Sequence, residues 1–365
     1  MYCFIVNPNA CSGKGIKIWK VLEETLQKAQ TPYEVFFTEK PGHATRIADM
    51  LCTKYAACTT DARCGDNLSR TIVAVGGDGT ANEVINGLHD YANIRFGYIP
   101  TGSGNDLARG LSLPTRPEEA LSAILHPARL RRIRLGCICT NGHVRHFAVS
   151  TGIGFDAAVC HEAFRSTIKP ALNRIGLGKL TYLGIALKQL LLLRPFPVTL
   201  TLDDGVPMKL PVYFIAFMNL KYEGGGFMFC PDATAEDEFL DICLIEKMPK
   251  LKILFLLPTA FRGRHVGYKG VHILRCKKAK LFAGSAQAIH TDGEAGSILY
   301  LSLFQSSLGN FTECGEILNR LHPIYHSVLV KSIKLLRQLI RCHRYAASAL
   351  SGKVACPPEQ TMADF

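Results

Sequence analysis

The feature that most constrains this chain is an apolar run that ends in a cluster of glycines and is followed at once by a helical pattern. Residues 72–75 are Ile-Val-Ala-Val, which is typical of a strand buried on both faces of a sheet. Gly76, Gly77 and Gly79 follow, and glycine lets a backbone approach a ligand closely. Apolar residues then recur at helical spacing at Ala81, Val84, Ile85 and Leu88. A helix N-terminus behind the turn favours an anion such as a phosphate.

A second loop of the same kind follows. Residues 97–106 read Gly-Tyr-Ile-Pro-Thr-Gly-Ser-Gly-Asn-Asp and again separate an apolar run from a helical stretch. Within the first helix, Thr80 and Glu83 have the spacing of a capping box. Two neighbouring glycine loops indicate one polyphosphate ligand, although glycines also serve simply to make tight turns between strands and helices.

The first 130 residues alternate apolar strands with helices, which predicts a doubly wound α/β domain. Strands are expected at 2–6, 33–38, 71–75 and 95–99, and helices at 16–29, 43–57 and 80–89. Ligands of such sheets bind at the carboxyl ends of the strands, where the loops at Asn7, Gly76 and Thr101 should meet. The polar segment 58–70 is expected to be an exposed loop.

Beyond about residue 130 the pattern changes to short strands separated by turns, which predicts antiparallel hairpins. The turns are expected at Asn141-Gly142, Asp204-Gly205 and Asp292-Gly293, and helices at 155–165, 174–193 and 250–261. We therefore expect a β-rich second domain over 131–304. A helical extension over 305–351 and a disordered tail over 352–365 should follow.

The order of these motifs resembles the diacylglycerol kinase catalytic family, in particular the soluble bacterial lipid kinases, and more remotely the sphingosine kinases and NAD kinases. The matching segments are Asn7-Pro8, Ser12-Gly13-Lys14, GGDGTANEV at 76–84, PTGSGNDLAR at 100–109, GIGFDA at 152–157, NLKYEGGGFMFCPDA at 219–233, Leu240-Asp241 and Asp292-Gly293-Glu294. The resemblance implies a three-layer α/β domain over 1–130, completed by part of 305–350, and a β-sandwich-like domain. It also implies an active site in the cleft between them.

The resemblance further implies phosphoryl transfer from ATP to an alcohol. That reaction requires a phosphate cradle, a divalent cation (Mg²⁺) and a carboxylate that accepts the hydroxyl proton. The positions similar to the family's nucleotide-binding residues are Asn7, Ser12, Lys14, Gly76, Gly77, Asp78, Gly79, Thr80, Glu83, Thr101, Gly102, Ser103, Gly104 and Asn105. Backbone N–H groups would hold the phosphates, while the Thr101 hydroxyl and the Asn105 amide fix their orientation. Lys14 could equally be an exposed loop lysine.

By the same resemblance Asp292 is the expected general base, and Glu294 orients it or holds magnesium. Alternate residues of an extended segment point the same way, and two neighbouring carboxylates raise one pKa. Asp-Gly is also a common hairpin-turn pair. Asp78 and Asp106 are expected to complete a carboxylate network around the catalytic magnesium.

One departure from the family pattern concerns a second cation. Asp237 matches a structural magnesium ligand, but Glu238 replaces the glycine that usually follows it. If that position takes a positive φ, a glutamate there costs about 1 kcal/mol or more.

The chain has a net charge of +12, which implies an acidic partner. Cations recur at helical steps near the C-terminus, beside an apolar face, at Lys331, Lys334, Arg337, Arg341 and Arg344. Such a helix can lie in an anionic membrane surface or pack on its own domain. Arg129, Arg131, Arg132 and Arg134 form a second cationic run. Nucleic acid is not expected, because neither run is interleaved with aromatics.

No apolar run reaches the roughly 18 residues of a membrane-spanning helix, and no basic-then-apolar leader opens the chain. We expect a cytoplasmic, peripherally membrane-associated protein, with a homodimer through β-domain edge strands as a further expectation. The 14 cysteines are expected to be small buried hydrophobic residues.

These patterns together predict an ATP-dependent, magnesium-requiring lipid kinase that converts diacylglycerol to phosphatidic acid. The alternatives are a kinase for another lipid alcohol (sphingoid base, undecaprenol, monoacylglycerol or phosphatidylglycerol) and an NAD-kinase-like enzyme. A catalytically silent membrane-binding regulator is a third alternative.

Overall fold

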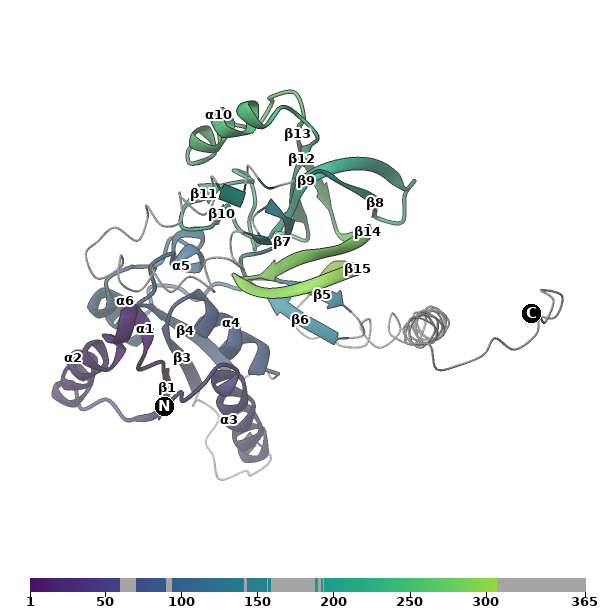
Figure 1. Ribbon diagram of the computed structural model, residues 1–365. Coiled ribbons are helices and arrows are strands. Elements are labelled where there is room, and N and C mark those ends of the chain that lie inside the picture. Colours follow the sequence, from purple (N-terminus) through teal and green to yellow (C-terminus); the bar gives the residue numbers. More distant parts are fainter. Residues whose placement is uncertain are drawn as a thin grey trace, which may run out of the picture. The chain divides into compact units, whose positions relative to one another are not determined.

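The computed structural model describes residues 1–59, 70–89, 94–140, 143–155, 157–158, 188–189, 192 and 194–306 (Figure 1). Within β15 the description of side chains is limited to Leu301 and Leu303. The helices predicted at 155–165 and 174–193, the loop at 58–70 and the Asn141-Gly142 turn therefore lie wholly or largely outside the described residues. The same holds for the expectations beyond residue 306, including the basic C-terminal helix.

Four parallel strands form the first sheet, in the order β2-β1-β3-β4. They span Tyr2–Val6 (β1), Tyr33–Phe37 (β2), Arg70–Gly76 (β3) and Ile94–Pro100 (β4), within one residue of the predicted strands. The strand order reverses between β1 and β3. In doubly wound sheets a ligand crevice opens at that point, outside the carboxyl ends of the strands. The predicted α/β fold of this part is confirmed.

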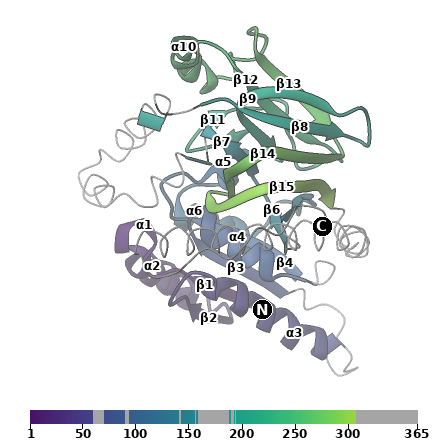
Figure 2. The same cartoon turned by 45° about the vertical axis from the view of Figure 1, so that its right-hand side comes forward.

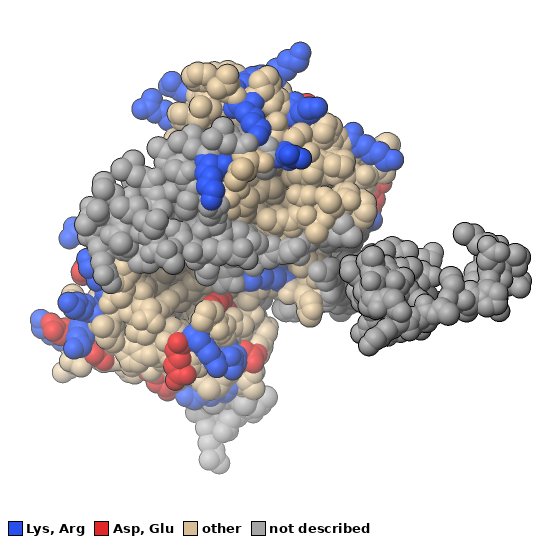
Figure 3. Space-filling model, in the orientation of Figure 1, with Lys and Arg blue, Asp and Glu red and all other residues tan. Residues whose placement is uncertain are grey.

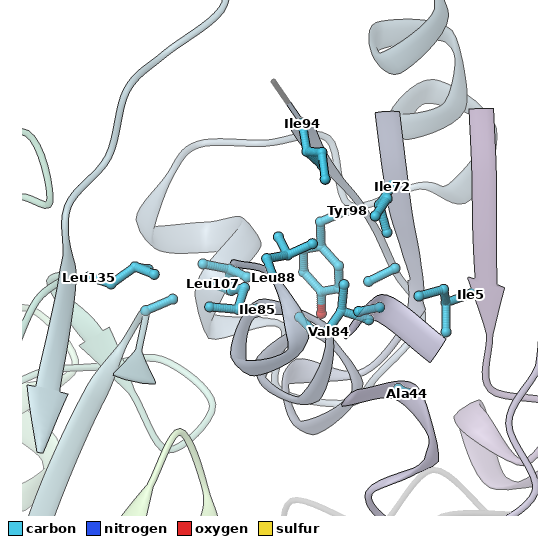
Figure 4. Close-up of a cluster of buried hydrophobic side chains, with 14 of the residues drawn as sticks. Ile5, Ala44, Ile72, Val84, Ile85, Leu88, Ile94, Tyr98, Leu107 and Leu135 are labelled. Carbon is cyan, nitrogen blue, oxygen red and sulfur yellow. The ribbon is translucent and has the colours of Figure 1, made fainter. Parts of the chain in front are cut away.

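Helices cover both faces of this sheet because successive strand residues point to opposite faces. On one face α3 (His43–Thr59) and α4 (Asp78–Gly87) pack over Ile5 and Ile72, as Figure 4 shows for the residues around Val84. On the other face α2 (Gly15–Lys28) and α6 (Pro117–Leu125) pack over Val6. Two short helices, α1 (Ala10–Gly13) and α5 (Asp106–Gly110), follow the loops after β1 and β4.

The second part is a nine-stranded antiparallel sheet in the order β13-β12-β9-β7-β14-β15-β5-β6, with β8 paired to β14 and β9. Its strands are β5 (Leu135–Thr140), β6 (His143–Phe147), β7 (Ser150–Gly154), β8 (Phe196–Leu202), β9 (Met208–Met218), β12 (Leu240–Glu246), β13 (Val271–Cys276), β14 (Lys278–Thr291) and β15 (Glu294–Ser306). Figure 2 shows β14 and β15 as a long hairpin. The predicted β-rich second domain is confirmed.

Two smaller elements complete the second part. A short hairpin joins β10 (Tyr222–Glu223) to β11 (Phe227–Met228) through three glycines. Helix α10 (Lys250–Ala260) lies against one side of the sheet through Ile253, Leu256 and Ala260. Seven of the eight cysteines whose burial is known are buried, as expected of small hydrophobic residues. None of the helices in the described ranges is long and apolar enough to cross a membrane.

Candidate active site

The structure brings the two glycine loops into direct contact. The backbone N–H of Thr101 donates a 2.7 Å hydrogen bond to the carbonyl oxygen of Gly76. A Cβ atom built on Gly102 would lie only 2.8 Å from the Gly77 Cα, so a side chain at position 102 has no room. A Cβ on Gly76 would lie 2.5 Å from the Thr80 side chain. The loops after β3 and β4 therefore form one surface that is lined by backbone.

Helix α4 begins directly behind this contact. Its N-cap is Gly77, and no side chain caps it, so the first N–H groups of the helix are left for an external acceptor. The predicted capping box is wrong, because the helix begins at Asp78 and not at Thr80. The Glu83 carboxylate instead accepts a 3.1 Å hydrogen bond from the N–H of Ala44, at the start of α3. Glu83 thus joins two helices and does not line the glycine loops.

The loop after β1 contributes Asn7. Its side-chain amide donates a 3.1 Å hydrogen bond to Thr80, and its Oδ1 accepts one from the N–H of Asn9. Asn7 therefore ties the first loop to α4. Ser12 and Lys14 are exposed, and the structure describes no hydrogen bond from either side chain to the glycine loops.

Two buried oxygens lie beside the glycine contact, and the described part of the chain offers them no hydrogen-bond partner. Within the described ranges the Thr101 hydroxyl and the Asn105 Oδ1 make no hydrogen bond. Asn105 holds this position with a left-handed backbone, φ 53°. Buried polar atoms are almost always paired in folded proteins, so an unpaired pair at a loop indicates a missing ligand. Ser103, between them, is exposed.

An acidic pair lies beneath the second loop. The Asp78 carboxylate accepts 3.1 Å hydrogen bonds from the N–H groups of Asp106 and Leu107. Burial, followed by the nearby Asp78 charge, raises the pKa of Asp106 to about 6. Burial also raises the pKa of Asp78. A Cβ on Gly104 would lie 3.2 Å from Asp78 and 3.5 Å from Asp106, so glycine keeps the space beside both carboxylates open.

This donor set fits a hard cation. Mg²⁺ is usually bound by one or two carboxylates together with substrate phosphates, and Asp78, Asp106 and the Asn105 oxygen supply such ligands. In the part of the chain that the structure describes, no cluster of three or more His, Cys, Asp or Glu residues could hold a metal ion. Bound phosphate oxygens would therefore have to complete the coordination.

A residue of the triple-glycine turn reaches this pair. Gly224, Gly225 and Gly226 all have positive φ, and the Gly225 N–H donates a 2.7 Å hydrogen bond to Asp106. Arg109 donates a 2.5 Å hydrogen bond to the other Asp106 oxygen. Gly225 and Arg109 lie within the sequence segments that match the family, but neither was predicted to have a role. Three consecutive glycines were the available signal for the turn.

Asp292 sits in a hairpin turn at the end of β14. Asp292 and Gly293 have φ values of 48° and 84°, and Thr291 pairs with Glu294, which describes a two-residue turn. The predicted turn is therefore present at the proposed catalytic position. Glu294 begins β15, and its side chain lies outside the described residues.

Four donors surround the Asp292 carboxylate. One oxygen accepts from the Asn82 amide at 2.7 Å and the Ala148 N–H at 2.8 Å. The other accepts from the N–H groups of Val149 and Ser150, both at 2.9 Å. A carboxylate offers about four lone-pair positions, and all are used here. Burial raises the pKa of Asp292, while these hydrogen bonds act in the opposite direction.

A second buried polar pair, which sequence reasoning missed, lies nearby. His290 Nε2 is 2.8 Å from the Glu223 carboxylate, and both side chains are almost fully buried. His290 precedes the Asp292 turn and Glu223 precedes the triple-glycine turn. No sequence pattern links these two residues, which belong to separate strands.

Asp237, the predicted structural magnesium ligand, pairs with residues of the protein itself. One Asp237 oxygen accepts a 2.9 Å hydrogen bond from the Phe239 N–H, and the other pairs with Arg275. Glu238 has no left-handed φ, so the expected backbone cost is absent, and its carboxylate pairs with Lys277 at 2.7 Å. A guanidinium thus lies beside this carboxylate, as Arg109 lies beside Asp106. A magnesium ligand at Asp237 stays a prediction.

Comparisons with known proteins match this architecture. Residues 1–138 match the family model for the diacylglycerol kinase catalytic domain, and residues 148–302 match that of the YegS C-terminal NAD kinase beta sandwich-like domain. "Putative lipid kinase YtlR" of Bacillus subtilis is 30% identical over 296 residues, which are 80% of this chain and 92% of that protein. The chain belongs to the diacylglycerol kinase family. It is a lipid kinase, a phosphotransferase with an alcohol acceptor, and ATP is the implied donor.

Other relatives agree with the family. A protein named diacylglycerol kinase from Mycobacterium tuberculosis is 33% identical over 207 residues, covering 56% of this kinase and 64% of that protein. A crystal structure of a diacylglycerol kinase from Bacillus anthracis str. Sterne superposes with a TM-score of 0.58 at 20% identity, over 83% of this chain and 93% of that one. That similarity shows that the kinase shares the fold.

Proposed function

We propose that this lipid kinase uses ATP and Mg²⁺ to phosphorylate diacylglycerol, giving phosphatidic acid. The observation that carries the proposal is the contact between Gly77 and Gly102 beside the unpartnered oxygens of Thr101 and Asn105. Backbone lining, unpaired polar atoms and a nearby acidic pair are the parts that phosphoryl transfer requires. The names of relatives support diacylglycerol as the acceptor.

Each part has a distinct role in this proposal. The N–H groups at the start of α4, from Asp78 to Thr80, hold phosphate oxygens of ATP. The Thr101 hydroxyl donates to the same phosphates. Asp78, Asp106 and the Asn105 oxygen would hold the Mg²⁺, which would supply positive charge beside the phosphates.

We assign the proton-accepting role to Asp292. Burial raises its pKa above the ordinary value of an aspartate, which is the direction that a base acting near neutral pH needs. Because all of its lone-pair positions are occupied, the assignment requires one hydrogen bond to open when the substrate hydroxyl enters. The Asn82 amide is the candidate, since it is the only side-chain donor among the four described contacts.

An apolar cavity in the β-rich part supports a lipid acceptor. A cavity of about 30 Å³ lies between α10 and the sheet, lined by residues that include Phe155, Phe214, Phe229 and Leu256. Such a lining suits a hydrocarbon chain and offers little to a soluble sugar or nucleotide acceptor. The cavity is too small for a whole acyl chain, so α10 would have to shift for one to enter.

The test is to incubate the purified kinase with γ-labelled ATP and a panel of acceptors in mixed micelles. The panel contains diacylglycerol, sphingosine, undecaprenol, phosphatidylglycerol and, in solution, NAD. We expect Mg²⁺-dependent labelling with diacylglycerol as the best acceptor. Preferential labelling of another lipid would reject diacylglycerol alone, and label in NAD only would reject the lipid acceptor.

A further inference from the structure

Helix α10 carries an outer apolar face that the proposed reaction does not use. Leu251 and Phe255 lie four residues apart on one side of the helix and are 70% and 75% exposed. Ile253, Leu256 and Ala260, on the opposite side, are buried against the sheet. A helix that is apolar on both sides needs an apolar partner on the side that faces away from the sheet as well.

The segment after α10 enlarges this exposed surface. Phe261, Val266 and Tyr268 are 49%, 42% and 47% exposed. We call these three residues, together with Leu251 and Phe255, the α10 surface. Single exposed apolar side chains are ordinary, but five large ones in one short stretch mark an interaction site.

The charged residues of the segment that carries the α10 surface, 247–291, all have one sign. No Asp or Glu occurs between Glu246 and Asp292. The basic residues that flank the surface are Lys247, Lys250, Lys252, Arg262, Arg264 and Lys269. Figure 3 shows Lys and Arg atoms among uncharged residues at the top of the molecule, where Figure 1 places α10. Exposed apolar side chains flanked along the chain by cations are complementary to an anionic lipid bilayer.

The α10 surface also adjoins the candidate active site. Phe261 stacks on Phe227 with 4.0 Å between the ring centroids. Phe227 directly follows the triple-glycine turn, whose Gly225 bonds to Asp106. A bilayer that contacts α10 would therefore lie next to the wall of the site that must receive a membrane lipid.

We propose that the α10 surface docks the kinase on an anionic lipid bilayer. Leu251 and Phe255 enter the boundary between headgroups and acyl chains, and the flanking Lys and Arg residues contact anionic headgroups. The proposal rests on the proposed function, because a kinase for a membrane lipid must reach the bilayer. It concerns a different segment from the basic stretch at 329–344, which the structure does not describe.

The test is vesicle flotation of the full chain, without ATP or diacylglycerol. Vesicles of phosphatidylcholine alone are compared with vesicles that also contain phosphatidylglycerol. We expect the L251S/F255S double variant to bind the mixed vesicles at least about tenfold more weakly than the unmodified protein. The matched control is V21S/M50S, which removes two residues that are each 48% exposed, on α2 and α3.

A second variant tests the charges. R262Q/R264Q should weaken binding to the phosphatidylglycerol vesicles by about fivefold per charge and leave binding to phosphatidylcholine unchanged. Circular dichroism checks that each variant is folded. Binding of L251S/F255S equal to that of V21S/M50S would overturn the proposal. The proposal would also be overturned if L251S/F255S lost a dimer in sedimentation velocity but bound vesicles like the unmodified protein, because α10 would then contact a second copy.

The two proposals fail separately in these experiments. Flotation that depends on Leu251 and Phe255, with no labelled phosphatidic acid in the micelle assay, would support the docking surface and reject the substrate. Labelled phosphatidic acid, together with flotation that does not depend on Leu251 and Phe255, would support the substrate and reject the docking surface.

Discussion

The side-chain amide of Asn82 donates a 2.7 Å hydrogen bond to the carboxylate of Asp292, joining residues 210 positions apart. Asn82 lies in α4, one turn after the first glycine loop, and Asp292 lies in the turn between β14 and β15. Arg145 donates a further 2.6 Å hydrogen bond to the Asn82 oxygen. Helix α4 and the β-rich sheet are thus connected by a buried polar contact.

The first prediction concerns Asp292→Asn. The new NH₂ group would replace one carboxylate oxygen and would face the two N–H donors that this oxygen accepts from. Those buried N–H groups would then lack an acceptor. We expect the free energy of unfolding to fall by about 1–3 kcal/mol, measured by urea denaturation, and turnover to be lost.

The matched control is Asp204→Asn, in the exposed turn between β8 and β9. Its carboxylate pairs with Lys280 on the surface, so its loss should leave the free energy of unfolding almost unchanged. Unchanged stability of Asp292→Asn would show that the four hydrogen bonds do not hold the carboxylate. Unchanged turnover would remove Asp292 from the reaction.

The second prediction compares two alanine substitutions across one contact. Gly102→Ala places a Cβ 2.8 Å from the Gly77 backbone, whereas Gly77→Ala places one at an ordinary 3.5 Å from Gly102. We expect Gly102→Ala to lower kcat/KM for ATP at least about tenfold more than Gly77→Ala, because only it forces the loops apart. Equal effects of the two substitutions would show that the loop contact does not shape the ATP site.

The third prediction is a pH dependence. The pKa of Asp106 is raised from 3.8 to about 6, so between these values the folded protein holds a proton that the unfolded chain has released. Stability should therefore fall as pH rises through this window, by at most about 1.4 kcal/mol per pH unit. Activity should rise through about pH 6, because the ionised carboxylate is needed to hold a cation.

Asp106→Asn isolates this effect. The pKa of Asp241 is also raised to about 6, chiefly by burial, and its contribution remains in the variant. Urea denaturation at a series of pH values should show a shallower slope for Asp106→Asn than for the unmodified protein. Identical slopes would mean that Asp106 titrates near its ordinary pKa.

The fourth prediction concerns the Asp237–Arg275 pair. Because Arg275 already holds this carboxylate, a chelator should leave the melting temperature of the unmodified protein unchanged. Arg275→Gln frees the carboxylate, so this variant should melt lower and should regain stability when MgCl₂ is added.

The control for that prediction is Lys277→Gln, which removes the partner of Glu238. It should show no stabilisation by MgCl₂, because Asp237 stays paired. A melting temperature that falls with chelator in the unmodified protein but not in Asp237→Asn would place a cation in the Asp237 loop.

Local patterns predicted the fold well because they are set by neighbouring residues. The apolar run at Ile72–Val75 and its glycines fix β3, the turn and the start of α4, and Asp292-Gly293 fixes a hairpin turn. The proximity of the two glycine loops follows from the parallel order of β3 and β4.

Contacts between distant segments could not be predicted in the same way. Nothing near Glu83 shows that its carboxylate meets Ala44, and the spacing to Thr80 gave a capping box that does not form. The pairing of Asp237 with Arg275 depends on how β12 and β13 align. Charge complementarity alone does not specify which of many basic residues will be the partner.

Because Gly225 donates a hydrogen bond to Asp106, the chain cannot be cut into two fragments near residue 130 without changing the candidate site. A fragment ending near residue 130 would keep both glycine loops but lose the turn that covers Asp106, and it would also lose the partner of Asn82. Exchanging β-rich halves between relatives would likewise succeed only if the incoming half carries a matching glycine turn and aspartate. The two halves are modules by architecture but form a single working unit.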